Sequence, residues 1–333
     1  MKDHEVIILF DKKKIIPILI SAVLCSLMVA VSDITGDTDI IFPEICAVAL
    51  GALAAPVRSW NTSKLRLLLL MTASALLGMA VVRFVPVPMY IKIPIGLAAV
   101  MTLITISQTD FLPAISTCIL PIMNSTQNFT YPLSIFILTG LILSAQHILE
   151  KTGMRSKHRY VPIEPDKALI TLRIKQVITI GIVCFLPVIL GKPFLIMPPL
   201  MVAYAEMSTP GSPIKKNMTT ATAMMALCTF IGCSSRILLC EIAGLPMAAA
   251  AGITCCAVLL AVDKTEFYFP PCGAISMLPF MIPQHTLIRF PFLVTVGFMI
   301  FALISLLSSN NLSREKKSCT DERAERTEAI ENI

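Results

Sequence analysis

The sequence predicts an all-α membrane protein. Hydrophobic residues make up 56% of the 333 residues and charged residues only 14%, with a mean hydropathy of +0.80, whereas soluble domains carry about 25% charged residues. Continuous apolar runs recur along the whole chain. A helix needs about 20 such residues to cross a bilayer, and barrel strands would alternate in hydrophobicity instead. We therefore expect about 10–12 transmembrane helices, interrupted by short Pro-rich broken segments.

The apolar runs divide into two sets of six, taken here in chain order. The first set covers 15–31, 40–57, 66–83, 92–107, 111–123 and 131–149, and the second covers 175–190, 194–208, 218–240, 245–262, 267–283 and 290–308. Two of the runs, 111–123 and 267–283, are short and contain several prolines. Proline interrupts the hydrogen bonds of a helix, so each of these two runs either crosses the membrane or re-enters on the same side.

The distribution of basic residues favours crossing. If every run crosses, all but five of the 27 lysines and arginines lie on the side of both chain ends, and the five are Arg83, Lys92, Lys192, Arg236 and Arg289. Loops rich in lysine and arginine stay in the cytoplasm. Two re-entrant runs would instead place the basic segment 150–173 on the opposite side. We therefore expect twelve crossings in the cytoplasmic (inner) membrane, with both termini cytoplasmic.

The two sets of runs resemble each other at an offset of about 155 to 159 residues, which indicates two homologous repeats. Residues 41–44 (Ile-Phe-Pro-Glu) align with 196–199 (Ile-Met-Pro-Pro), and the prolines of 113–123 align with those of 271–281. The predicted organisation is a cytoplasmic N-terminal tail 1–14, membrane repeat 1 at 15–149, a basic cytoplasmic linker 150–173, membrane repeat 2 at 174–308 and a charged cytoplasmic C-terminal tail 309–333. An even number of crossings makes the repeats parallel, as in transporters whose halves rock against each other.

Charged residues within the apolar runs are candidates for function, because a charge in lipid is costly. Arg236 lies deep in its run and Arg83 ends the corresponding run of the first repeat. Two guanidinium groups, one per repeat, would offer positive charge to an anion. The alternatives are that Arg83 extends to the membrane interface and that Arg236 forms an ion pair with Glu241. Glu44, which follows a proline, is interpreted as a helix cap.

The Pro-rich short runs are the second candidate site. Proline leaves upstream carbonyl groups unpaired, and a substrate could bind to the backbone around Pro113 or around Pro270, Pro271 and Gly273. The alternative is a kinked helix that only packs. His285, near the mouth of the second short run, is included as a substrate-binding candidate rather than a catalytic one.

The sequence contains no motif of an enzyme. It has no Gly-rich phosphate loop and no cysteine or histidine cluster with the spacing of metal ligands. Nearly all of the 11 cysteines lie in apolar runs and are interpreted as packing residues. We therefore expect no enzymatic activity, no metal and no cofactor. Basic residues are dispersed, so nucleic acid is not an expected partner. The expected partners are the lipid bilayer, a small-molecule or anion substrate and, in a homo-oligomer, further copies of the chain.

The segment Phe269-Pro270-Pro271-Cys272-Gly273-Ala274, together with Ile196-Met197-Pro198-Pro199, resembles the HPP family of integral membrane proteins, named for a His-Pro-Pro motif. Phe269 stands at the position of the motif histidine, so no role of that histidine carries over. Some family members are assigned nitrite transport. The resemblance therefore implies a compact helical unit and a small anion as one candidate substrate.

These observations predict a multi-pass inner-membrane, transporter-like protein that moves a small solute between two membrane repeats, with anions among the candidates. Two other functions remain open. One is a non-transporting membrane scaffold or assembly factor whose partner binds the basic linker 150–173. The other is an exporter of the aromatic-acid type.

Overall fold

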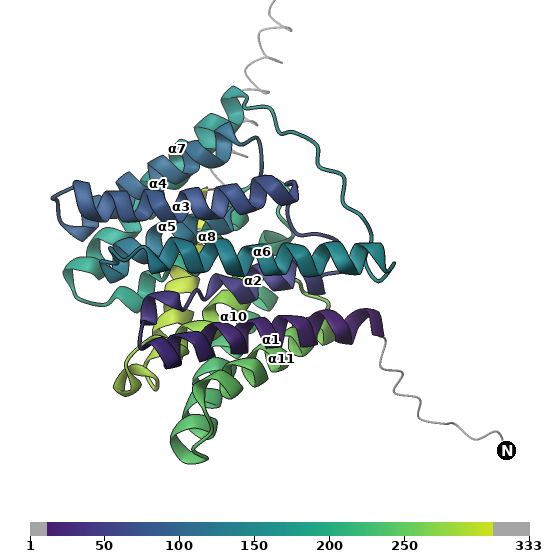
Figure 1. Ribbon diagram of the computed structural model, residues 1–333. Coiled ribbons are helices and arrows are strands. Elements are labelled where there is room, and N and C mark those ends of the chain that lie inside the picture. Colours follow the sequence, from purple (N-terminus) through teal and green to yellow (C-terminus); the bar gives the residue numbers. More distant parts are fainter. Residues whose placement is uncertain (1–11, 309–333) are drawn as a thin grey trace, which may run out of the picture.

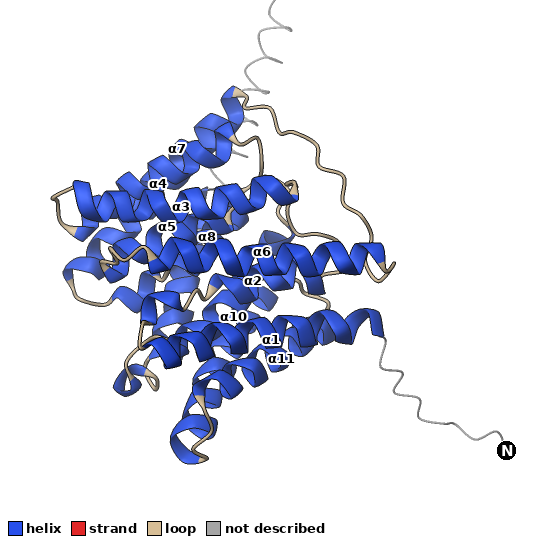
Figure 2. Cartoon of the chain, in the orientation of Figure 1, coloured by secondary structure: helices blue, strands red, loops and turns tan. Residues whose placement is uncertain are grey.

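The computed structural model describes residues 12–308, and within this range all regular structure is helical (Figures 1 and 2). Eight of the helices there are long and apolar enough to cross a membrane. They are α1 Lys12–Thr35, α3 Lys64–Phe84, α4 Met89–Ile106, α6 Thr130–Lys151, α7 Lys167–Ile189, α10 Met218–Ser235 with its π-helical continuation η4 Arg236–Ile242, α11 Met247–Thr265, and a last helix, Phe290–Ser308. The prediction of an all-helical fold is confirmed for these residues, and its long helices suit a protein that crosses a membrane several times.

Large apolar side chains cover the outside of the bundle. Val23, Ile182 and Phe230 are each more than 60% exposed, and many other leucines, isoleucines and phenylalanines on the long helices are exposed as well. Contiguous apolar surface of this extent is unfavourable in water. Lipid is therefore the environment that suits these outer faces.

Four shorter helices fill the centre of the bundle. They are α2 Glu44–Ala49 with its π-helical continuation η2 Leu50–Ala54, α5 Pro113–Asn124, α8 Pro198–Ser208, and α12 Pro270–Met277 with the 3-10 turn η5 Leu278–Phe280. Nearly all of their residues are buried. Each begins at or directly after a proline, which suits the first helical turn because its backbone nitrogen needs no hydrogen-bond partner there.

The short helices cover only part of the thickness of a membrane. The 12 residues of α5 extend about 18 Å, compared with about 30 Å for the hydrocarbon layer. Two of the four are preceded by 3-10 turns, η1 Thr38–Ile40 before α2 and η3 Pro193–Ile196 before α8. The predicted runs 40–57, 194–208 and 267–283 thus each contain a helix shorter than the run, and the run 111–123 corresponds to the 12-residue helix α5.

Polar contacts place the loops at two ends of the bundle. At one end, Lys64 at the start of α3 pairs with Glu150 at the end of α6, and Asn61 donates its backbone N–H to Asp110 at 2.7 Å. At the other end, Asn128 before α6 donates to Asp37 after α1. Helices α1 and α6 therefore run antiparallel, and the beginning of α1 lies at the same end of the bundle as the end of α6 (Figure 1).

The non-helical part of the linker is shorter than predicted, because α6 continues to Lys151 and α7 begins at Lys167. It lies along the end of the bundle as an extended segment (Figure 1). Arg66 of α3 donates to the Tyr160 hydroxyl, and Asn61 donates to the Val161 carbonyl. Of the predicted tails, residues 12–14 belong to α1, whereas 1–11 and 309–333 lie outside the described residues.

Helices from the two halves of the chain pack in matching pairs. Helix α1 packs on α11 and α4 packs on α7, while α2 packs on α12 and α5 on α8. Two close approaches between helices match as well. A side chain at Gly78 of α3 would collide with the Cys118 carbonyl of α5, and one at Gly232 of α10 would collide with the Ser276 carbonyl of α12. The centre of the bundle is thus built from α2, α5, α8 and α12, each held by a neighbouring long helix.

Candidate functional site

The first turns of the four short helices meet at one small cavity in the middle of the bundle. Its volume is about 10 Å³, close to the smallest space that holds one water molecule. The lining residues are Glu44 and Ala47 of α2, Pro113 and Ser116 of α5, Pro199 and Val202 of α8, and Pro270, Pro271 and Ala274 of α12. Residues three apart lie on one face of a helix. Each helix therefore presents the same face of its first turn to the cavity.

Glu44 is the charged residue among those that line the cavity. Its side chain is only 1% exposed. One carboxylate oxygen, Oε1, accepts a hydrogen bond from the Ser116 hydroxyl, whereas Oε2 has no hydrogen-bond partner. Burying a polar group without a partner is unfavourable, and burying a charge is more so. An oxygen of this kind at a cavity indicates a place where a water, an ion or a proton is bound.

The orientation of the short helices makes the cavity electropositive. The N-terminus of a helix carries a partial positive charge of roughly half an elementary charge. Helices α5, α8 and α12 direct three such ends at the cavity, and Glu44 begins the fourth helix, α2. A carboxylate, or another small anion, is the kind of group that such an arrangement stabilises.

Gly273 holds two of the short helices close together. A Cβ atom at this position would lie 2.9 Å from the carbonyl carbon of Cys46 and 3.0 Å from the backbone nitrogen of Ala47. Any other residue would push α12 away from α2. Gly273 therefore sets the position of Ala47 and of the cavity wall, without itself lining the cavity.

The site is polar on one side and apolar on the other. In the predicted alignment of the two halves of the chain, Glu44 corresponds to Pro199 and Ser116 corresponds to Ala274. All four residues line the cavity. The first half of the chain therefore supplies the carboxylate and its hydroxyl partner, while the second half supplies only apolar contacts.

Three of the predicted substrate-binding residues, Pro113, Pro270 and Pro271, line the cavity. The other charged candidates lie elsewhere. Arg236 begins η4 and donates from Nη1 to the carbonyls of Pro279 and Ile282, the latter at 2.6 Å. It therefore binds the end of the α12 and η5 segment.

The alternative ion pair of Arg236 with Glu241 is absent. Within residues 12–308 the ion pairs are Lys14–Asp263 and Lys64–Glu150. Arg83 is exposed, with its guanidinium 5.9 Å from the centre of the Phe84 ring. His285 is exposed in the 3-10 turn η6 Gln284–Thr286.

A second group of charges lies at the linker end of the bundle. Arg58 is 9% exposed and donates from Nη1 to the Thr62 carbonyl at 2.9 Å, while its Nε and Nη2 have no partner. Burial lowers the pKa of Arg58, and burial together with the charge of Arg58 lowers the pKa of Arg155 to about 10. Burial raises the pKa of Asp110, against the hydrogen bond from Asn61. Both signs of charge are present, so this group is a mixed network rather than a site for one ion.

Arg155 connects this network to α2. Its guanidinium donates to the carbonyls of Leu53 at 2.5 Å and Ala55 at 2.8 Å, at the end of η2. A cation suits the C-terminal end of a helix, where carbonyl groups are unpaired. The linker is therefore fixed to the helix whose first residue is Glu44.

The sequence did not single out Glu44 as part of a site. A glutamate directly after a proline is a normal helix cap. The neighbouring sequence does not show whether such a cap is exposed to water or buried in the middle of the bundle. The available signal is the predicted alignment of Glu44 with Pro199, since an acid that is absent from the aligned position is not needed to start the helix.

The fold, with eight apolar helices long enough to cross a membrane and a small polar centre, is compatible with a multi-pass membrane protein. No family model, curated protein or solved structure matches this chain. The resemblance to the HPP family therefore stays a prediction.

Proposed function

We propose that this protein is a multi-pass, transporter-like protein that moves a small anion through the central cavity. The observation that carries the proposal is the meeting of four proline-led first turns around Glu44, whose Oε2 is buried without a partner. Broken helices that meet at mid-membrane are a common way to build a transport site. Three positive helix ends favour an anion over a cation.

Glu44 would couple the movement of the anion to that of a proton. In this structure the carboxylate of Glu44 occupies the electropositive centre. A second negative charge about 4 Å away would be unfavourable by about 4 kcal/mol at an effective dielectric constant of 20. Protonation of Glu44 removes that repulsion. Anion entry and proton binding at Glu44 are therefore expected to occur together.

We propose further that the chain consists of two homologous membrane repeats. The cavity residues support this proposal. The alignment of residues 41–44 with 196–199 pairs the lining positions of α2 with those of α8. The alignment of 113–123 with 271–281 pairs the lining positions of α5 with those of α12. The matching helix pairs and the matching glycine contacts of Gly78 and Gly232 support it as well. Movement of one repeat against the other would open the cavity alternately to each side.

The proposed location is the inner membrane, with the linker and both termini in the cytoplasm. Support comes from the basic residues at the linker end of the bundle, since Lys14, Lys64, Arg155 and Lys215 all lie there. Lysine and arginine are retained on the cytoplasmic side during insertion.

The test is anion-driven proton movement in proteoliposomes that contain the purified full-length protein and a pH-sensitive dye in the lumen. Gradients of chloride, nitrate, phosphate and benzoate are applied in turn. We expect at least one of them to move protons with the wild-type protein and not with empty liposomes. Glu44→Gln keeps the size of the side chain but carries no proton, so its proton signal should fall to the level of empty liposomes.

One further variant serves as a control and another as a second probe of the cavity. Glu206→Gln changes another acid of a short helix, at the far end of α8 and outside the cavity lining, and it should keep the wild-type signal. Ser116→Ala removes the hydrogen bond to Glu44 and should shift the pH dependence of the signal. Equal loss in Glu44→Gln and Glu206→Gln, with both proteins folded, would contradict a special role of the cavity.

The scaffold alternative makes a different prediction. Lys157 and Arg159 of the linker are exposed, so a protein partner could bind them. If no anion moves protons or produces a current with the wild-type protein, the transport proposal fails. Replacement of Lys157 and Arg159, rather than of Glu44, would then be expected to remove the cellular function. A response to benzoate alone would favour the aromatic-acid exporter.

A further inference from the structure

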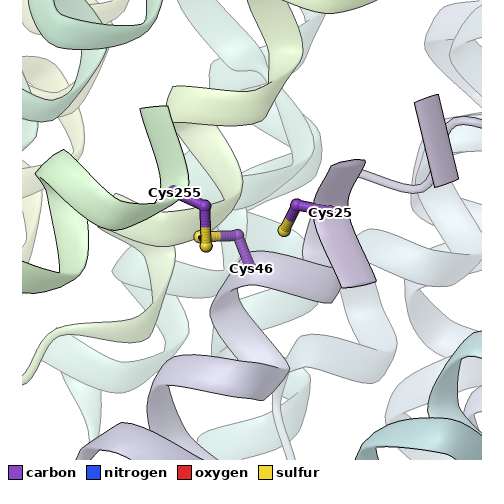
Figure 3. Close-up of side chains that lie close together, drawn as sticks. All are labelled: Cys25, Cys46 and Cys255. Atoms are coloured by element: carbon purple, nitrogen blue, oxygen red, sulfur yellow. Dashed lines mark hydrogen bonds between the residues drawn. The ribbon is translucent and has the colours of Figure 1, made fainter. Parts of the chain in front are cut away.

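Three buried cysteine side chains from different helices meet in the interior of the bundle. Cys25 of α1, Cys46 of α2 and Cys255 of α11 are completely buried, and they point toward one another from their three helices (Figure 3). Their sulfur atoms all lie within 4.8 Å of one another, and those of Cys46 and Cys255 are 3.7 Å apart. The three positions are far apart in the sequence, so only the fold brings the thiols together.

We propose that these three thiols form a binding site for a trivalent metalloid, with arsenite as the representative. Sulfur atoms bonded to one ion at about 2.3 Å lie about 3.5 to 4.0 Å from one another. The distance between Cys46 and Cys255 already falls in this range, and Cys25 needs only a small movement to complete it.

The charge balance of the reaction selects the metalloid. Arsenite is the neutral acid As(OH)₃ near pH 7, and three thiols are neutral as well. In the binding step three As–O bonds break and three As–S bonds form, and each thiol proton leaves with one hydroxide as water. Arsenic remains As(III), so no oxidant or reductant is needed. The product is neutral, and a neutral product suits a site with no access to water.

Other thiol-binding ions fit the same site less well. Zinc prefers four ligands in a tetrahedron, but among the residues that the structure describes, this group contains only the three cysteines. A monovalent copper ion bound by three thiolates leaves a net negative charge. Burial of such an uncompensated charge is strongly unfavourable.

Close helix contacts near the thiols fix the positions of the three helices relative to one another. Helices α1 and α11 approach closely at Gly252, where a Cβ would lie 3.3 Å from the Ser26 side chain, and Ser26 donates to the Ala248 carbonyl at 2.6 Å. On α2, Cys46 abuts Gly273. Bound metalloid would therefore tie α1 and α11 to α2. Because the thiols are buried, loading requires local opening and is expected to be slow.

The test uses the full-length protein in detergent, reduced with a phosphine and then freed of reductant. Protein is incubated with arsenite overnight and passed over a desalting column. Bound arsenic is counted by mass spectrometry, and arsenic X-ray absorption gives the number of sulfur neighbours. We expect one arsenic per chain with three sulfur neighbours. This measurement on the wild-type protein does not depend on any variant.

The variants Cys25→Ala, Cys46→Ala and Cys255→Ala test the assignment. Each removes one ligand, so arsenite affinity should fall by roughly 100-fold or more, as expected when one arm of a multivalent site is lost. The remaining arsenic signal should change to two sulfur neighbours and one oxygen. Each variant must elute as a single species before it is compared.

Two other buried cysteines provide matched controls. Cys184 of α7 belongs to no thiol group in the described part of the chain, and Cys228 of α10 lies beside Cys272. Cys184→Ala and Cys228→Ala should bind arsenite as the wild type does. The proposal fails if wild-type protein retains no arsenic, if the signal with three sulfur neighbours survives in Cys46→Ala, or if zinc or copper binds at these thiols and arsenite does not.

Discussion

At the scale of single residues, two glycines decide how closely the long helices approach the centre. Gly78 faces the Cys118 carbonyl and Gly232 faces the Ser276 carbonyl, and neither carbonyl can move without its helix. The neighbouring prolines Pro121 and Pro279 lie against the same two glycines. Both glycines therefore help to fix the position of a short helix whose first turn lines the cavity.

The variants Gly78→Ala and Gly232→Ala should each destabilise the protein by about 1–3 kcal/mol, because an added methyl group overpacks against backbone. The measurement is thermal unfolding of the purified protein in detergent. Gly140→Ala in α6 is the control, since nothing lies within 4 Å of a Cβ at this position. Alanine there should leave stability unchanged or raise it by up to about 1 kcal/mol. Equal effects at all three positions would contradict the close helix contacts.

For Arg236, the sequence predicted a functional role, and the structure shows the contacts that the residue makes. A charged residue within an apolar run was expected to be important, and the structure gives it two carbonyl partners, those of Pro279 and Ile282. These partners lie at the end of the segment whose beginning, Pro270 and Pro271, lines the cavity. A role in substrate binding stays a prediction, because the carbonyls already account for the position of the guanidinium.

At the scale of elements, the linker is a fixed part of the bundle rather than a free connection. Tyr160 donates to the Gln108 carbonyl at 2.9 Å, and the Ile163 backbone N–H donates to the same carbonyl at 3.0 Å. Arg155 holds the end of η2. The linker thus touches the loop before α5 and the end of α2, which are two of the helices around the cavity.

His158 makes this attachment sensitive to acid. Burial lowers its pKa below the usual 6.5, and the nearby charges of Arg58 and Arg155 lower it further, against Asp110 and Glu150. A histidine with a lowered pKa in the folded state contributes stability above pH 6.5 that is lost as the pH falls through the folded pKa. Acidification from pH 7.5 to 5.5 should therefore lower the melting temperature of the wild-type protein.

The variant His158→Gln should lose part of this pH dependence, because glutamine takes up no proton. Melting temperatures of wild type and variant at pH 7.5 and pH 5.5 provide the measurement. Lys157→Gln is the control, since it removes a neighbouring exposed charge and should keep the dependence of the wild type. An unchanged slope in His158→Gln would show that other groups cause the effect.

The length of each short helix could not be read from the sequence. An apolar run such as 40–57 looks the same whether it is helical throughout or begins as an extended segment, and here the helix begins only at Glu44. The prolines did predict where the backbone breaks, and Pro113, Pro270 and Pro271 indeed line the cavity. Local sequence thus located two of the helix ends, those of α5 and α12, but not the point in space where the four helices meet.

At the scale of the whole molecule, the positions of the long helices could be predicted from the sequence, whereas the contacts between them could not. Eight long helices follow from apolar length alone, and they were predicted near their actual positions. The group formed by Cys25, Cys46 and Cys255 was not predicted, because its members have no characteristic spacing and come from three helices. Contacts between distant parts of the chain carry no signal in one sequence.

The proposed orientation of the protein in the membrane can be tested directly with inserted epitopes. A short epitope inserted after Gly153 in the linker should be reached by antibody only from the cytoplasmic side, together with an epitope at the N-terminus. An epitope after Gly191, at the other end of α7, should be reached only from the opposite side. Inside-out and right-side-out vesicles distinguish the two. The same side for Gly153 and Gly191 would contradict a complete crossing by α7.

The four short helices also have a consequence for how the protein is made. A segment of about a dozen residues is too short to enter a bilayer on its own as a spanning helix, and its unpaired backbone groups are tolerated only next to protein. The eight long helices can each insert into the bilayer during synthesis, one after another. The short ones, in contrast, must wait for neighbours that arrive later, since α2 packs on α12, more than two hundred residues further along the chain. Biogenesis of this protein is therefore expected to finish only after synthesis of the last short helix, with α2 held until then at the insertion machinery or at the membrane surface.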